Sequence, residues 1–214
     1  MADHRRFLYA PGVQEASFFL DPLRSSPRHR ADFVERVPGV ATTPDKQETL
    51  ARLQPHHEEA AKRLGFSEIH YAEQIHGKAV ALVTANSPLI TPGADALISR
   101  DPVLLGIHVA DCGALYLLDQ ATGAIGLVHS GKKGTELDIT TATIETMRDR
   151  FGTRPADLIA VLGPCIRPPH YEVDFAHYHD CGLCTAFHPE RFYSYRREKG
   201  NTGRLLALFG ILPS

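Results

Sequence analysis

Residues 104–129 read LLGIHVADCGALYLLDQATGAIGLVH, and their pattern indicates the architecture of the whole chain. The stretch holds three apolar, β-favouring runs at 104–109, 115–118 and 125–129, separated by turn-forming residues. Further short runs of this kind lie at 69–74, 80–83, 96–99 and 158–162. Many short strands without a regular strand–helix–strand alternation predict a mixed sheet with helices packed outside it, which is an α+β fold.

Two segments outside these runs have helical character. Residues 45–64, DKQETLARLQPHHEEAAKRL, hold helix formers and stop before Gly65, but Pro55 inside them is expected to divide the segment into two short helices. Residues 136–151 place apolar side chains at helical spacing and predict another helix.

The first 44 residues carry the weakest pattern in the chain. A short apolar run predicts a strand near 15–20, and the Pro- and Arg-rich residues 22–30 predict an irregular loop.

Length and composition limit the class of protein. A chain of 214 residues with 43% hydrophobic and 22% charged residues is expected to form a single domain, 1–214. Its formal charge of −2 gives no basic field for nucleic acid, and no apolar stretch is long enough to cross a membrane. Four cysteines are too few for a disulfide framework. We expect a cytoplasmic protein, monomeric or homodimeric.

Three potential metal ligands stand at the ends of apolar runs. They are His76 before Gly77, Cys112 before Gly113, and His129 shortly before a further glycine. Glycine leaves room for a ligand or for close backbone approach. Two imidazoles and a thiolate form a normal ligand set for catalytic zinc, which keeps a fourth position open. Taken singly, each residue has an ordinary alternative, because a histidine at a strand end is usually a hydrogen-bonded structural residue and a buried cysteine acts as a small hydrophobe.

The order of several motifs supports the metal-site interpretation. Gln-x-His-Gly, Ala-Asp-Ala, Ala-Asp-Cys and Val-His-x-Gly are followed by Gly-Pro-x-Ile and Tyr-Glu-Val, at 74–77, 94–96, 110–112, 128–131, 163–166 and 171–173. This series resembles the YfiH/laccase-domain family, whose members were long described as polyphenol oxidases and are now regarded as enzymes acting on purine nucleosides. The resemblance runs from about residue 69 to the C-terminus.

The resemblance implies a layered α/β/β/α sandwich with zinc held by His76, Cys112 and His129. It also implies phosphorolysis of adenosine, inosine, guanosine and methylthioadenosine, with some adenosine deamination. A zinc ion can bring the pKa of water to about 7, which suits attack on C6 of a purine. Copper is the alternative metal, with polyphenol oxidation as the activity, but the chain lacks the His-Cys-His sequence of blue-copper sites.

Other residues near these motifs are candidates for substrate chemistry. Asp111 is a candidate catalytic residue that orients a ligand or acts on a substrate hydroxyl, with a turn-capping role as the alternative. Candidate substrate- or phosphate-binding residues are Lys78, Ser130, Lys132 and Lys133.

The chain departs from the family pattern at two of those lysines. The family has Trp-Arg where Lys132 and Lys133 stand, and this chain contains no tryptophan. Lysine is a point charge and lacks the bidentate fork of arginine. A non-catalytic nucleoside- or metal-binding protein of the same fold is therefore a further alternative.

Cysteine and histidine are also concentrated at 170–188, where Cys181 and Cys184 form a CxxC motif close to His177, His179 and His188. The spacing lacks the second cysteine pair of a structural zinc site. A structural or pocket role for Cys184, and burial of Cys165 as a small hydrophobe, are the expectations here.

Overall fold

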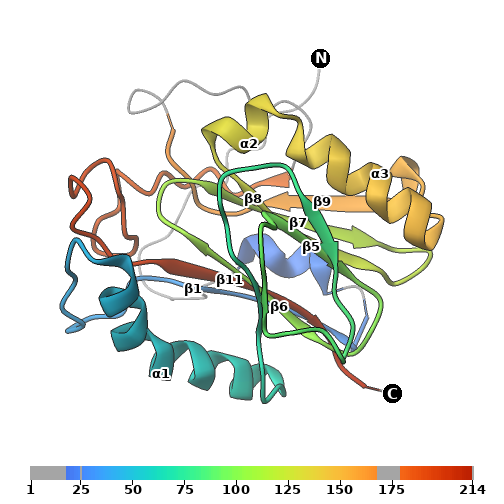
Figure 1. Ribbon diagram of the computed structural model, residues 1–214, viewed down its shortest axis with the longest axis horizontal. Coiled ribbons are helices and arrows are strands. Elements are labelled where there is room, and N and C mark those ends of the chain that lie inside the picture. The colour runs from blue at the N-terminus through green and yellow to red at the C-terminus, as the bar shows by residue number, and fades with distance from the viewer. Residues whose placement is uncertain (1–17, 25, 168–178, 214) are drawn as a thin grey trace.

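Two mixed β-sheets form the centre of the protein in the computed structural model, which describes residues 18–24, 26–167 and 179–213 (Figure 1). The first sheet has the order β1-β11-β6-β2-β4, formed by His29–Val34, Leu205–Ile211, Leu104–Val109, His70–Ala72 and Ile90–Thr91. The second has the order β10-β9-β7-β8-β5-β3, formed by His179–Asp180, Leu158–Leu162, Gly113–Asp119, Ile125–Ser130, Ala96–Ser99 and Val80–Leu82. Parallel and antiparallel pairs occur in both sheets.

Helices cover the outer face of each sheet. Helix α1 (Lys46–Leu64) lies against the first sheet, and α2 (Lys132–Glu136) and α3 (Ile139–Phe151) lie on the second (Figure 1). Strand β11 contributes to two packed interfaces, because Leu205 and Phe209 face the other sheet while Leu206 and Leu208 pack toward α1. A further apolar cluster fills the space between the second sheet and α3. The predicted α+β class and the α/β/β/α layers are confirmed.

Helix α1 is continuous, so the expected division at Pro55 is wrong. The Asp45 carboxylate accepts hydrogen bonds from the first turn of the helix, and Gly65 ends it in the left-handed region at φ 94°. Pro55 lies on the exposed face, so the hydrogen bond that it cannot donate is lost on the solvent side. Packing of the opposite stripe, which includes Leu53 and Ala60, maintains the helix through this position.

The helix predicted at 136–151 is α3, which begins three residues later than expected, and the separate short helix α2 precedes it. Asp138 has φ 60°, a left-handed conformation that separates α2 from α3. After this break, Ile139, Thr143 and Met147 form the buried stripe of α3, which packs on β8, β5 and β3. Leu137, expected on the buried stripe, is 38% exposed because it falls in the break.

The expectations for the N-terminal part are also corrected. Phe18–Leu23 is a 3-10 helix (η1) rather than a strand, with residues 15–17 outside the described part. Leu20 and Leu23 are fully buried, and Pro22 has no N–H for a β-ladder. Strand β1, by contrast, begins inside the range expected to be a loop. Its alternating burial is masked in the sequence by charged residues, and its pairing partner β11 is far away in the chain.

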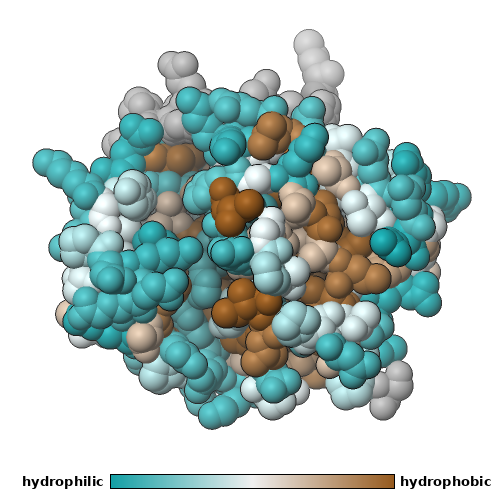
Figure 2. Space-filling view, in the orientation of Figure 1, coloured by the Kyte–Doolittle hydropathy of each residue, from teal (hydrophilic) through white to brown (hydrophobic). Residues whose placement is uncertain are grey.

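The surface is mostly hydrophilic, with hydrophobic side chains reaching it near the centre of the face shown in Figure 2. Among the described residues, no helix has both the length and the apolar composition needed to span a membrane.

Candidate metal centre

Cys112 lies in the turn that joins the two sheets. Strand β6 of the first sheet ends at Val109, and β7 of the second begins at Gly113. Asp111 takes φ 84° in this turn, which allows so short a connection. In the second sheet, Ala114 of β7 lies opposite His129 of β8. The connection between the sheets therefore places Cys112 beside His129.

His76 comes from the loop that follows β2, four residues beyond the end of that strand. Gln74 and His76 both have left-handed backbone angles, φ 63° and 61°. The amide side chain of Gln74 donates to the carbonyl of His108 at 2.6 Å and accepts from its N–H at 2.8 Å. This pair of hydrogen bonds anchors the loop to β6 and holds His76 above the sheet connection.

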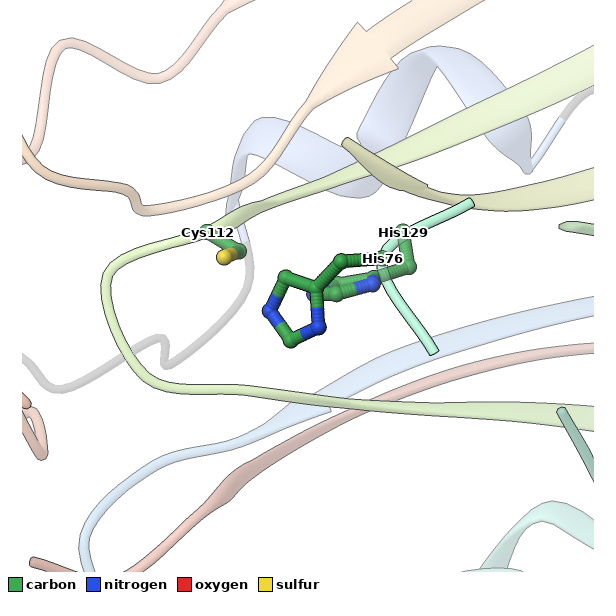
Figure 3. Close-up of side chains that lie close together, drawn as sticks. All are labelled: His76, Cys112 and His129. Carbon is green, nitrogen blue, oxygen red and sulfur yellow. The ribbon is translucent and has the colours of Figure 1, made fainter. Parts of the chain in front are cut away.

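The three predicted ligand residues come together in space. One ligand atom from each of His76, Cys112 and His129 lies within 4.8 Å of the others, and Figure 3 shows the three side chains gathered at one point. The two imidazole rings are 4.8 Å apart between centroids, with an interplanar angle of 80°. His129 is buried, Cys112 is half-buried and His76 is exposed, so the site opens to solvent on the His76 side.

Gly131 leaves the space that these side chains occupy. A Cβ atom at this position would lie 2.8 Å from the Cys112 sulfur and 3.3 Å from Cδ2 of His76. The steric crowding at the site therefore requires a glycine at position 131, two residues after His129.

Asp95 holds two of the three ligand segments, and its role was not predicted from the sequence. Its carboxylate accepts hydrogen bonds from the backbone N–H groups of Ile75, His76 and Gly77 at 3.1, 2.9 and 2.7 Å. It also accepts from Nδ1 of His129 at 2.9 Å, which leaves Nε2 as the nitrogen that can bind a metal ion once its proton is lost. The signal in the sequence is a fully buried charge between two alanines, in the Ala-Asp-Ala motif.

These contacts set the charges at the site. Burial opposes ionisation of Asp95, but hydrogen bonds from His129 and the loop outweigh it and lower the pKa of Asp95. Burial also disfavours the imidazolium form of His129, yet Asp95 and Cys112 raise the pKa of His129 to about 9. For the Cys112 thiol, hydrogen bonds from His129 and His76 overcome burial and lower the pKa to about 6. The site is thus built to keep a thiolate next to positive charge.

Asp111 is hydrogen-bonded to chain segments around the site. Its two carboxylate oxygens accept hydrogen bonds at 2.7 Å, one from the hydroxyl of Thr185 and the other from the N–H of Arg196. Its carbonyl accepts from the N–H of Ile166 at 2.9 Å. Asp111 therefore ties three distant segments to the turn that carries Cys112, an arrangement closer to the capping alternative than to direct action on substrate.

The four candidate substrate-binding residues are close to His76 or His129 in the sequence. Lys78 is exposed and directly follows the loop of His76. The hydroxyl of Ser130 shares a hydrogen bond with Thr135 at 2.9 Å. Lys132 and Lys133 are exposed at the start of α2, and Lys132 lies 3.8 Å from the Glu136 carboxylate. No contact between these side chains and the three ligand residues is seen.

The remaining cysteines lie away from this group. All four cysteines are free thiols, and among the described residues only His76, Cys112 and His129 form a cluster able to hold a metal. Burial raises the pKa of Cys165 to about 12, so this thiol is neutral and packs as a small hydrophobe. Cys184 is also buried, in a backbone bridge with Cys165. The motif at 171–173, His170, His177 and the side chain of His179 lie outside the described residues.

The donor set fits a metal ion on chemical grounds. Two imidazole nitrogens and a thiolate converge from rigid segments, and one imidazole is oriented by a carboxylate on its other nitrogen, as is usual for metal-bound histidine. Such ligands suit zinc, and also copper. The partly exposed His76 leaves a side on which substrate can approach.

A family model described as "Multi-copper polyphenol oxidoreductase laccase" matches residues 39–178 and 175–212 of the chain. Among curated proteins, a purine nucleoside phosphorylase of Deinococcus radiodurans is 31% identical over 228 aligned residues, covering 84% of this chain and 88% of the relative. Purine nucleoside phosphorylase YlmD of Geobacillus stearothermophilus is 26% identical over 192 residues, covering 64% of this chain and 70% of the relative.

Solved structures share the fold. The crystal structure of Geobacillus stearothermophilus YlmD has a TM-score of 0.74 at 21% identity and covers 90% of this chain and 94% of its own. The Bacillus licheniformis hypothetical protein YfiH has a TM-score of 0.75 at 22% identity and covers 89% and 99%. The layers described above are therefore those of a known fold.

Proposed function

This chain belongs to the multi-copper polyphenol oxidoreductase laccase family, and from its ligand site and its relatives we propose that it is a zinc-dependent purine nucleoside phosphorylase. The observation that carries the proposal is the convergence of His76, Cys112 and His129 within 4.8 Å. Relatives that cover most of the chain have been given the name purine nucleoside phosphorylase. Adenosine, inosine, guanosine and methylthioadenosine are the proposed substrates.

The reaction replaces one bond at the anomeric carbon with another. A phosphate oxygen bonds to C1′ of the ribose as the bond from C1′ to N9 of the purine breaks, and the purine leaves with a proton. Zinc, when bound to the three ligands, supplies a Lewis acid with an open coordination position.

The chain's own residues prepare the site for that role. Asp95 keeps a proton on Nδ1 of His129 and orients the ring, so that Nε2 is the nitrogen that would exchange its proton for the metal ion. The same carboxylate orders the loop of His76 through three N–H groups, so the exposed ligand does not have to be ordered when substrate arrives. Lys78, Ser130, Lys132 and Lys133 are proposed to contact substrate.

Deamination of adenosine is proposed as a secondary activity of the same site. It would replace the amino group at C6 with oxygen from water and release ammonia. Because the zinc, the site and the adenosine are shared with phosphorolysis, the two activities should be lost together when Cys112 is replaced.

Copper-dependent polyphenol oxidation is the competing function, favoured by the description of the family model. Multicopper oxidation needs several copper sites, whereas the described residues contain one cluster with two imidazoles and one thiolate. A non-catalytic nucleoside-binding protein is the other alternative. The cytoplasmic location and the monomeric or homodimeric state stay predictions.

Chromatographic product analysis separates these functions. The purified protein is incubated with adenosine, inosine and guanosine, with and without phosphate, and with a phenolic substrate after copper loading. Free base that forms only with phosphate supports phosphorolysis, and inosine from adenosine without phosphate supports deamination. Phenol oxidation with a blue absorption band would favour the oxidase, and nucleoside binding without any product would favour the non-catalytic alternative.

A further inference from the structure

Two cations outside the ligand set, Arg204 and Lys46, act electrostatically on groups of the ligand site. Arg204 directly precedes β11, and Lys46 is the first residue of α1. The first turn of α1 and the start of β11 lie on the same side of the molecule in Figure 1.

The register of β11 places Arg204 next to the turn of Cys112. Leu205 pairs with Val109 in the antiparallel β11–β6 ladder, so Arg204 comes opposite the first residue after β6, two residues before Cys112. The N–H of Arg196, in the same connection, bonds to the carboxylate of Asp111 at 2.7 Å and holds the whole segment against that turn. In agreement with this position, the charges of Cys112 and Asp111 act on the Arg204 guanidinium.

The Arg204 side chain is half-buried and only partly satisfied. Its Nη1 donates to the carbonyl groups of Thr202 and Gly203 at 3.3 and 2.9 Å. Its guanidinium carbon lies 6.0 Å from the centroid of the Tyr195 ring, which is 56% exposed. No hydrogen bond joins Nε or Nη2 to another described residue, so the Nε–Nη2 edge of the guanidinium can donate two hydrogen bonds to a ligand.

Lys46 adds a second positive charge to the same region. Partial burial, followed by the charge of Arg204, lowers the pKa of Lys46, while the charges of Asp95 and Glu73 raise it, so Lys46 is within electrostatic reach of both Arg204 and the carboxylate that holds the His76 loop. Within the described part of the chain, neither cation has an ion pair with a carboxylate. Two half-satisfied cations without a direct carboxylate partner among the described residues leave positive charge for which a bound anion would be a partner.

We propose that Arg204 and Lys46 bind the inorganic phosphate consumed in the reaction, Arg204 as a two-point donor and Lys46 as a point charge. This assignment rests on the proposed phosphorolysis for its biological meaning, but the anion site itself does not. In this assignment, the arginine that binds phosphate lies outside the Lys132-Lys133 segment.

The test measures phosphate binding and kinetics on the full-length, metal-containing protein. Inorganic phosphate is titrated by calorimetry at constant ionic strength into the wild type, Arg204→Gln, Arg204→Lys and Lys46→Gln. Each Gln variant should weaken phosphate binding and raise the KM for phosphate about tenfold or more, with the KM for inosine changed by less than about twofold. Arg204→Lys should fall between the wild type and Arg204→Gln.

Matched controls and outcomes separate this proposal from the enzymatic one. Lys62→Gln removes the same charge from the exposed last turn of α1 and should change nothing. If the wild type binds phosphate and Arg204→Gln and Lys46→Gln do not, the anion site stands even where no phosphorolysis is found. If phosphorolysis proceeds with unchanged phosphate affinity in both Gln variants, the assignment of Arg204 and Lys46 is wrong while the proposed function survives. Because Lys46 is exposed, its variant should fold even if the Arg204 variants do not.

Discussion

The carboxylate of Asp95 accepts a hydrogen bond from Nδ1 of His129 at 2.9 Å, and both side chains are buried. The pairing of β5 with β8 creates this relationship, because Ala96 lies opposite Val128 and the next pair brings Asp95 opposite His129. The same carboxylate holds the loop of His76, so one buried charge orients two of the three proposed ligands.

Replacing Asp95 with asparagine tests this orienting role. An amide accepts through one oxygen only, so the variant must leave N–H groups of the 75–77 loop or of His129 without an acceptor. Zinc affinity should fall roughly 10- to 100-fold, measured by competition with a chromogenic chelator. Asp149→Asn, on the exposed face of α3, is the control and should keep the affinity of the wild type. An unchanged zinc affinity in Asp95→Asn would show that the hydrogen bond to His129 does not support a metal site.

Gly131→Ala tests the steric requirement at the centre. The backbone at Gly131 has φ −88°, which alanine adopts without strain, so the main effect is the collision of its Cβ with Cys112 and His76. We expect the variant to fold, with a circular dichroism spectrum like that of the wild type, and to lose zinc binding and turnover. Gly163→Ala is the matched control, because a Cβ there makes no contact shorter than 3.4 Å. Full zinc occupancy in Gly131→Ala would contradict the ligand geometry.

Much of the site could be predicted from the sequence, because Cys112 and His129 close apolar runs before glycines. The role of Asp95 could not, since it depends on which strand pairs with β8 and in which register. The position of Arg204 near Cys112 could not be predicted for the same reason, because it depends on the pairing of β11 with β6, far apart in the chain. The break at Pro55 was wrong because tertiary packing of α1 outweighs the loss of a single exposed hydrogen bond. That His76, Cys112 and His129 bind metal stays a prediction.

Removal of the metal provides a third prediction. Dialysis against a strong chelator should abolish phosphorolysis, and about one equivalent of zinc per chain should restore it, as expected for a single three-ligand site. Copper added instead should bind without producing a polyphenol oxidase. Activity that is unaffected by complete metal removal, verified by elemental analysis, would show that the reaction is independent of this site.

The buried histidine of α1 gives a prediction for pH dependence. Burial, helped by the charge of His56, lowers the pKa of His57 from 6.5 to about 4, and its ring packs 5.3 Å from that of His108. The unfolded chain therefore takes up this proton at a higher pH than the folded chain. Stability is fully present above pH 6.5, falls as the pH drops from 6.5 to 4, and loses nothing more from this group below 4.

His57→Phe should flatten that part of the pH profile. The free energy of unfolding in urea, compared at pH 7 and pH 4, should decrease by roughly 3 kcal/mol less in the variant than in the wild type. The same substitution at the exposed neighbour, His56→Phe, should leave the slope nearly unchanged. Parallel profiles for the wild type and His57→Phe would mean that His57 is not buried in its neutral form.

The proposed catalytic metal centre is tested most directly by the release of hypoxanthine from inosine by the wild type and by Cys112→Ala in phosphate buffer. Circular dichroism confirms that both are folded, and elemental analysis gives their zinc content. We predict phosphate-dependent release of hypoxanthine by the zinc-containing wild type, and neither zinc nor release in the variant. Equal release by the folded, zinc-free variant would contradict a catalytic metal centre at His76, Cys112 and His129.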